Sequence, residues 1–251
     1  ALSDICDEFH LVGIAKLGGH IRYFRRNQVR MATMAGKIFK AKMLFQRGGW
    51  LRHFPDWRCC RTFYPHFLTR SQDRKDDTLL TCLIDAYAAD GIRFAPATDF
   101  APELLVDLGP LTNRKPTAAQ LKDIRFGWTL AKELGRVDVG QTVVVKGQAV
   151  IAVEAVEGTD DCIRRAGQLC PQGGFTVVKV AKPQQDMRFD VPTIGLGTLE
   201  TLVEAGGRVL AVEAKRTIRV DAEQTLKFAR RHQLTLIALD EPDVGARQAA
   251  A

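Results

Sequence analysis

The sequence lacks the cysteine and histidine patterns of a zinc site or a disulfide framework. Its six cysteines form no CxxC pair and no Cys/His cluster at zinc-ligand spacing. The neighbours Cys59 and Cys60 are poorly placed to bond each other, and no signal peptide is recognisable. We therefore expect reduced thiols in a cytoplasmic protein.

Long apolar runs are also missing. The longest ones fall well short of the roughly 18–20 residues that a membrane-spanning helix needs, so we expect a protein that is soluble or lies against a surface. The five histidines show no catalytic spacing, and no Ser-His-Asp or Cys-His arrangement is recognisable. These absences leave catalysis by an activated serine or cysteine without support.

Basic and aromatic side chains are concentrated in one part of the chain. The formal net charge is +7, and residues 37–75 hold ten Lys/Arg against two acids, together with eight aromatic residues. This basic and aromatic segment suits an anionic membrane surface, where rings sit at headgroup level and Lys/Arg meet phosphates. It also suits single-stranded nucleic acid, and a solvated basic face over a small aromatic core is a third interpretation.

Helix-like and strand-like segments alternate along the 251 residues, which predicts an α/β fold. The stretch 101–116 contains Pro and Gly but no strong pattern, and it is predicted to be a linker. We therefore expect two small α/β domains, residues 1–112 and 117–243. The clearest expected strands are 142–145, 149–155, 175–180, 208–214 and 234–239, and the clearest helices are 76–89, 117–134, 159–169 and 221–232.

The most informative stretch is the polar loop that follows the apolar strand 175–180. Cations and helix N-termini attract phosphate, and two carboxylates four residues apart can hold a divalent cation together with phosphate oxygens. The alternative is a solvated charged loop tied by internal ion pairs. The stretch supplies three cations, two carboxylates, an amide and a hydroxyl: Lys179, Lys182, Arg188, Asp186, Asp190, Gln185 and Thr193.

A second acidic segment, 154–160, also ends a strand and opens a helix. Gly158 lets the backbone approach a ligand closely, while Thr159 and Asp160 offer oxygen atoms. Taken alone, the segment is more simply an N-cap with a turn, in which Thr159 or Asp160 caps the helix. Two acidic loops at strand ends in one small domain nevertheless favour a metal-assisted site.

Several blocks of the sequence resemble one family. The C-terminal blocks 138–141, 153–160 and, above all, 182–195 (KPQQDMRFDVPTIG) are long and specific, whereas 34–37 (MAGK) and 76–80 (DDTLL) are shorter. They resemble the UDP-2,3-diacylglucosamine pyrophosphatase of the lipid A pathway, in the family whose fold differs from the calcineurin-like enzyme with the same activity. The resemblance extends from about Lys16 to Leu239.

The resemblance implies cleavage of the substrate to UMP and 2,3-diacylglucosamine 1-phosphate (lipid X). It implies a divalent cation, Mg²⁺ or Mn²⁺, and water attack on the sugar-linked phosphorus. Two domains are expected to enclose the lipid-linked UDP-sugar, with the enzyme peripheral at the inner face of the cytoplasmic membrane. The basic and aromatic segment would then meet the anionic membrane surface or the acyl chains.

The same resemblance assigns roles to individual residues. Asp190 is expected to be the essential carboxylate, orienting water or holding metal, with Asp186 beside it as a second catalytic group. Asp190, Asp186 and Asp160 are the expected metal ligands. The expected substrate-binding residues are Lys182, Gln185, Arg188, Thr193, Gly158, Thr159 and Lys179, with Asp77 and Lys37 reaching across from the first domain.

One departure from the family pattern concerns the first domain. Family members open with a strand and a Gly-rich turn that this sequence lacks, so we expect a first domain that is truncated relative to the family. Two other readings therefore stay open: a catalytically inactive relative that binds a nucleotide-sugar or lipid phosphate, and a basic nucleic-acid-binding protein. In the pyrophosphatase reading no nucleic-acid partner is expected, and a homodimer is allowed.

Overall fold

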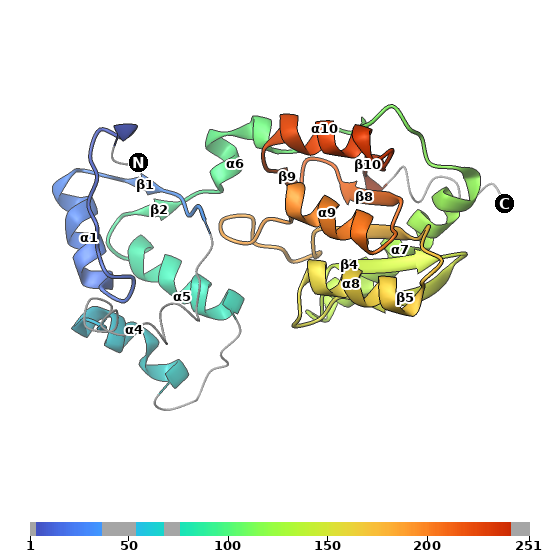
Figure 1. Cartoon of the computed structure of the whole chain (residues 1–251). Helices are drawn as coiled ribbons and strands as arrows, with labels where there is room; N and C mark the ends of the chain where they lie inside the picture. The colour runs from blue at the N-terminus through green and yellow to red at the C-terminus, as the bar shows by residue number, and fades with distance from the viewer. Residues whose placement is uncertain (1–3, 37–53, 68–75, 242–251) are drawn as a thin grey trace. The chain divides into compact units, whose positions relative to one another are not determined.

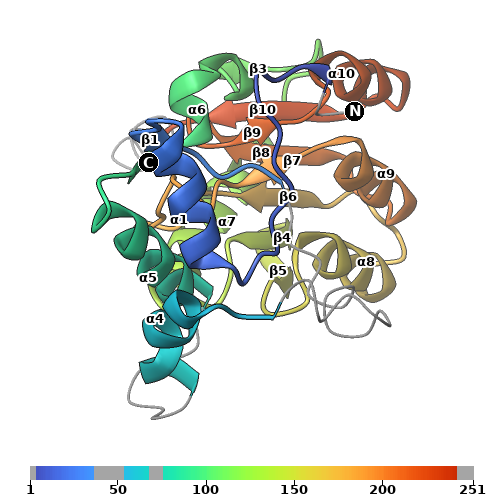
Figure 2. The same ribbon diagram turned by 90° about the vertical axis from the view of Figure 1, so that its left-hand side faces the viewer.

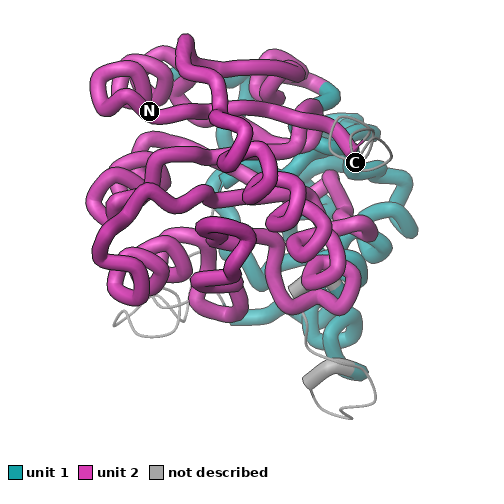
Figure 3. Tube along the Cα trace, turned by 90° about the vertical axis from the view of Figure 1, so that its right-hand side faces the viewer, with its two compact units in different colours: residues 1–99 teal, residues 100–251 magenta. Residues whose placement is uncertain are grey.

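Alternating helices and strands build two units, residues 1–99 and 100–251 (Figure 3). The structure is a computed structural model that describes residues 4–36, 54–67 and 76–241. Both units are mixtures of helix and strand, so the prediction of an α/β chain with two domains is confirmed. Most of the basic and aromatic segment lies outside the described residues, and so does Lys37.

The first unit has a small parallel sheet and several helices (Figure 1). Its two strands pair in parallel, with Met31 opposite Arg93 and Ala32 opposite Phe94. Leu17, Ile21, Ile84 and Tyr87 are among its buried apolar side chains. The elements are α1 (Leu17–Arg26), β1 (Met31–Ala32), α4 (Trp57–Phe67), α5 (Asp76–Ala88) and β2 (Arg93–Phe94), and α6 (Ala97–Phe100) spans the boundary.

The second unit is longer and more regular. It opens with a 3₁₀ turn (Pro102–Leu104), and a short parallel pair, β7 with β9, lies outside its main sheet. Its helices are α7 (Ala118–Arg136), α8 (Thr159–Leu169), α9 (Leu196–Glu204) and α10 (Ala222–Arg231). Its strands are β3 (Gly109–Pro110), β4 (Thr142–Lys146), β5 (Ala149–Val153), β6 (Thr176–Lys179), β7 (Thr193–Ile194), β8 (Val209–Glu213), β9 (Ile218–Arg219) and β10 (Thr235–Leu239).

The main sheet of the second unit has the order β3-β10-β8-β6-β4-β5. Strands β6, β8 and β10 run parallel, β4 is antiparallel to both β6 and β5, and β3 is antiparallel to β10. The carboxyl ends of β5, β6, β8 and β10 therefore lie at one edge of the sheet. The start of β4 lies at the same edge.

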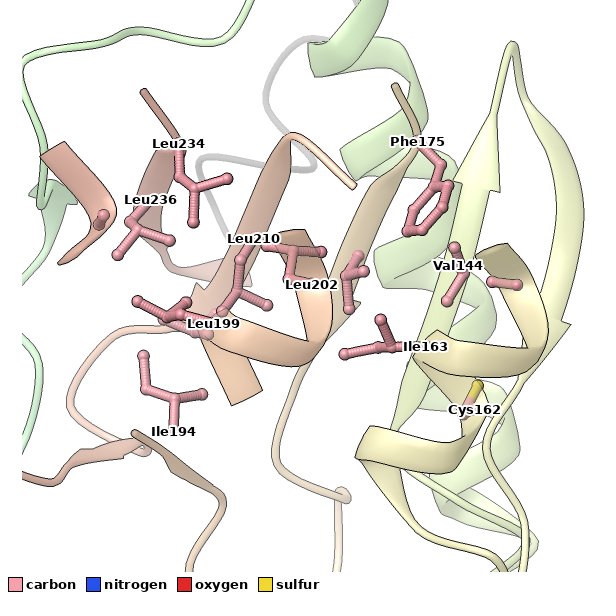
Figure 4. Packing of buried hydrophobic residues seen from close by; sticks show 14 of the residues in the cluster. Val144, Cys162, Ile163, Phe175, Ile194, Leu199, Leu202, Leu210, Leu234 and Leu236 are labelled. Atoms are coloured by element: carbon pink, nitrogen blue, oxygen red, sulfur yellow. The ribbon is translucent and has the colours of Figure 1, made fainter. Parts of the chain in front are cut away.

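Helices cover both faces of this sheet, and the strands alternate their side chains between them. Helices α8, α9 and α10 lie on one face (Figure 2), where Val144, Leu210 and Leu236 pack against helix residues such as Ile163 and Leu202 (Figure 4). Helix α7 covers the other face, where Ile124, Trp128 and Ala131 pack against Val143, Val145, Val178 and Ala211. Strands buried on both faces explain the continuous apolar runs of the sequence.

The domain boundary differs from the predicted linker. The chain divides between Asp99 and Phe100, and residues 109–110 form an edge strand that pairs with β10. The stretch predicted as a linker therefore belongs largely to the second unit. A strand of two residues that contains Gly and Pro gives no periodic signal, which is why the pattern did not reveal it.

Local signals set the boundaries of other elements. The turn between β4 and β5 has positive φ at Gly147 (58°) and Gln148 (59°), as a two-residue hairpin requires. Helix α8 differs from its expected capping: Gly158 is the N-cap residue, and neither Thr159 nor Asp160 caps it.

None of the helices in the described ranges is long and apolar enough to cross a membrane.

The start of α7 provides a test of local stabilisation. The Thr117 side chain accepts the Gln120 N–H at 3.2 Å, and the Gln120 side chain accepts the Thr117 N–H at 2.9 Å. This capping box predicts that Thr117→Ala lowers the free energy of unfolding by about 1 kcal/mol in urea denaturation. Thr129→Ala, an exposed change on the same helix, should stay within about 0.5 kcal/mol of the parent. Equal effects of the two changes would contradict a stabilising role for the cap.

Candidate functional site

Strand register brings polar residues together at the carboxyl edge of the main sheet in the second unit. Thr142 is the register partner of Lys179, and Lys179 is in turn the partner of Val212. Glu154 follows β5 and donates its N–H to the Thr142 carbonyl at 2.9 Å. Glu213 ends β8 beside them. This edge is where ligands bind in open α/β sheets.

Glu154 is buried and held from several sides. Its Oε1 accepts the Thr159 hydroxyl at 3.0 Å, and its Oε2 accepts the Gln141 N–H at 3.4 Å. The Thr159 hydroxyl also lies 3.3 Å from that of Thr142. A Cβ at Gly140 would lie 2.1 Å from the Glu154 carbonyl oxygen, so only glycine fits there. Thr159 thus supports Glu154, and its predicted contact with substrate stays a prediction.

Lys179 is buried, with 6% of its surface exposed. Its ammonium group donates to the carbonyl of Thr193 at 2.9 Å, which joins the far end of the loop after β6 back to that strand. Burial lowers the pKa of Lys179, and the nearby carboxylates of Glu154, Asp160 and Asp190 act in the opposite direction. Lys179 therefore bonds inside the protein to the loop that follows its strand, and its predicted contact with phosphate stays a prediction.

Asp190 is held by an amide from its own loop. The Gln185 side-chain nitrogen donates to Asp190 Oδ2, and the Gln185 side-chain oxygen Oε1 accepts the Lys182 N–H at 2.8 Å. The Gln185 N–H donates to the Lys182 carbonyl at 3.0 Å. Gln185 consequently fixes the half-buried Asp190 carboxylate relative to the start of the loop.

Asp186 forms an ion pair with Arg188, two residues further along the chain. The Arg188 guanidinium donates to both Asp186 oxygens, at 2.6 to 3.1 Å, and the Arg188 N–H donates to Oδ1 at 3.1 Å. These bonds lower the pKa of Asp186, with partial burial opposing them. The pair shapes the loop internally, as the alternative interpretation of the sequence allowed.

The predicted phosphate-binding cations both have carboxylate partners. Lys182 Nζ lies 2.7 Å from Asp138 Oδ1, and Arg188 pairs with Asp186. The side chains of Lys182 and Arg188 are 16% and 35% exposed. Phosphate binding by either cation would require an exchange or a sharing of partners.

The expected metal ligands do not form a cluster. Within the described part of the chain, no three His, Cys, Asp or Glu side chains lie close enough together to hold a metal ion. Asp190, Asp186 and Asp160 are therefore not brought together as a protein-made cage. A site of one or two carboxylates completed by phosphate oxygens, the usual arrangement for Mg²⁺, needs fewer protein ligands, so the expectation of a divalent cation stays a prediction.

The remaining predicted residues have separate environments. The exposed Thr193 hydroxyl donates to the Val191 carbonyl at 2.9 Å. Gly158 has φ of 84° and precedes α8, whose first turn carries Asp160 and Asp161. Asp77 lies in α5 of the first unit, and its side chain is not among those described.

The sequence interpretation missed a buried ion pair at this edge. Lys132 Nζ lies 2.9 and 2.8 Å from the two oxygens of Glu213, whose side chain is 8% exposed. The only sequence signals were an acid ending the apolar run 209–213 and a lysine beside the apolar face of α7. Neither signal identifies the partner, which is 81 residues away.

The bond between Asp186 and Arg188 makes a testable prediction about pKa. Arg188→Gln should raise the pKa of Asp186 towards its ordinary value of about 3.9, as followed by NMR titration of the carboxyl carbon. Because the folded-state pKa is lowered, the stability that the pair contributes is present above about pH 4 and disappears as pH falls through the lowered pKa. Arg164→Gln, which removes an exposed pair with Asp161, should leave Asp186 unchanged.

Comparison with known proteins identifies relatives of both units. The family model for the LpxI N-terminal domain matches residues 1–104, and the model for the LpxI C-terminal domain matches residues 107–237. The Caulobacter vibrioides protein described as UDP-2,3-diacylglucosamine pyrophosphatase LpxI is 29% identical over 236 residues, which cover 91% of this chain and 81% of that protein. These matches agree with the resemblance found in the sequence blocks. Because the two family models together span most of the sequence, the chain belongs to the LpxI family.

Proposed function

We propose that this chain hydrolyses the pyrophosphate bond of UDP-2,3-diacylglucosamine, giving UMP and 2,3-diacylglucosamine 1-phosphate (lipid X) in lipid A biosynthesis. The observation that carries the proposal is the similarity, over both units, to a relative that bears this activity in its name. The edge of the main sheet adds a half-buried carboxylate and several cations at the position where α/β proteins bind ligands.

In the proposed reaction, water attacks the phosphorus attached to the sugar. A new bond forms between the water oxygen and that phosphorus, and the bond to the bridging oxygen breaks, so that the bridging oxygen leaves with UMP. Asp190 accepts a hydrogen bond from the attacking water and orients it. Gln185 holds the Asp190 carboxylate in place, so that little reorganisation is needed during the reaction.

Lys182 and Arg188 are the proposed phosphate-binding groups. Each carries its charge on the loop that contains Asp190, and each is held by an aspartate before substrate binds. Charge-assisted hydrogen bonds from these cations would balance the pyrophosphate and the charge that develops on the leaving UMP. A Mg²⁺ or Mn²⁺ ion bound with the phosphate oxygens would supply further neutralisation of this charge.

The lipid-linked substrate also suggests where the protein works. Acyl chains partition into membranes, so an enzyme that acts on this substrate is proposed to work peripherally at the inner face of the cytoplasmic membrane. Within the described part of the basic and aromatic segment, Phe54, Trp57 and Tyr64 are exposed, and exposed aromatic residues suit an interface with headgroups.

Replacement of one carboxylate tests the proposed chemistry. Asp190→Asn keeps the shape of the side chain but removes its charge, and it should lower kcat for UMP release from UDP-2,3-diacylglucosamine by at least about 100-fold. Asp161→Asn, on the exposed face of α8, is the matched control and should retain the parental rate. Turnover by the parent that persists in Asp190→Asn would refute the role of Asp190. Substrate binding without any turnover by the parent would instead support an inactive relative.

Metal removal provides a separate test. The parent, assayed in excess EDTA, should lose most of its turnover, and added Mg²⁺ or Mn²⁺ should restore it. Full activity in EDTA after dialysis would show that the cations of the protein suffice. Ca²⁺ is a useful comparison, because its larger size and looser coordination suit a compact phosphate complex poorly.

A further inference from the structure

The backbone of Ala181 needs partners where the sheet ladder ends. Strands β6 and β8 pair up to Lys179 and Val212, and Ala181 lies two residues further on. Ala181 is fully buried, so its N–H and carbonyl groups cannot turn to water. Glu213 supplies the first partner, because its Oε2 accepts the Ala181 N–H at 2.7 Å.

Lys132 supplies the second partner from the opposite direction. It projects from α7, and its Nζ donates to the Ala181 carbonyl at 3.1 Å as well as to both oxygens of Glu213. The two side chains are 13% and 8% exposed. Ala181 is therefore held at both backbone groups by one buried ion pair.

The held residue begins the loop that carries Asp190. Ala181 directly precedes Lys182, whose N–H and carbonyl both bond to Gln185, and Gln185 in turn donates to Asp190. Hydrogen bonds, joined by the peptide bond between Ala181 and Lys182, thus connect the buried ion pair to the proposed catalytic carboxylate.

We propose that Lys132 and Glu213 are positioning residues, which fix the start of this loop and thereby place Asp190 for reaction. The inference rests on the proposed hydrolysis of the lipid-linked pyrophosphate, and it adds two residues that do not touch the substrate. Misplacement of a reacting group by about 1 Å can cost roughly 100-fold in rate, so a loosened loop should be visible in kcat.

A comparison of single and double variants separates positioning of the loop by Lys132 and Glu213 from stabilisation of the whole unit. Removal of one partner of a buried ion pair leaves an uncompensated charge, whereas replacement of both partners by apolar residues of similar volume is often neutral for stability. The double variant Lys132→Met/Glu213→Leu should therefore be more stable than either single variant. Arg216, which lies 3.8 Å from Glu213 Oε1, also loses this partner, but its side chain is 35% exposed and stays hydrated. It still lacks both partners of the Ala181 backbone.

The decisive experiment compares this double variant with the parent in three measurements: thermal unfolding, kcat and KM for UDP-2,3-diacylglucosamine, and hydrogen exchange of the loop amides 182–192. We expect stability above that of the single variants, kcat lowered by about 10- to 100-fold with a smaller change in KM, and faster exchange of the loop amides. Parental kcat together with parental loop exchange would overturn the proposal.

Asp123→Asn is the matched control. Asp123 is also buried and accepts two backbone N–H groups, from Gly147 and Gln148 at 3.1 and 2.6 Å, but it holds the hairpin at the opposite edge of the sheet. This variant should lose stability without a change in kcat or in exchange of the loop 182–192. An equal loss of kcat in the control would show that any destabilisation of the unit lowers activity, and would also overturn the proposal.

A milder variant, Glu213→Gln, tests the proposal if the double variant does not fold. Glu213→Gln keeps the side-chain shape and one oxygen for the Ala181 N–H but removes the charge that pairs with Lys132. We expect a several-fold lower kcat and faster loop exchange, and unchanged values would count against positioning. If the parent shows no turnover at all, the proposed function fails, and hydrogen exchange still decides whether the pair holds the loop.

Discussion

Buried charges at the carboxyl edge of the main sheet determine how the loop after β6 is arranged. Lys179 and Glu213 both end strands inside the protein, where an uncompensated charge costs several kcal/mol. Lys179 donates to the Thr193 carbonyl at one end of the loop, and Glu213, neutralised by Lys132, accepts the Ala181 N–H at the other. The requirement to satisfy these groups therefore fixes both ends of a segment that has little regular structure of its own.

The ion pairs within and beside the loop have a consequence for the proposed phosphate binding. Lys182 and Arg188 are held by Asp138 and Asp186, so neither cation has to be ordered when an anion arrives. A side chain that is already fixed loses less conformational entropy on binding. The opposing cost is that the aspartates compete with the phosphate, which favours ligands with several negative charges over ligands with one.

Much of the fold could be predicted because its signals are local. The capping box of Thr117 and Gln120 lies within four residues. The apolar runs of β6, β8 and β10 indicate strands that are buried on both faces. For the site, the sequence predicted the loop after β6 and its place at the carboxyl edge of the sheet, but not the contacts between its side chains. The pairing of Lys132 with Glu213 and of Lys182 with Asp138 depends on how α7 packs on the sheet, across 81 and 44 residues of sequence. The sequence alone gives neither this packing nor the direction of the side chains.

The two carboxylates of the loop also have different surroundings, which their spacing in the sequence did not show. Asp186 is bound on both oxygens by the Arg188 guanidinium group, and these hydrogen bonds lower the pKa of Asp186. A carboxylate engaged in this way is a weak acceptor for the proton of an attacking water. Asp190 is oriented by a neutral amide and lies in the field of the buried Lys179. These contacts of Asp186 support the proposal that Asp190, and not Asp186, orients the attacking water.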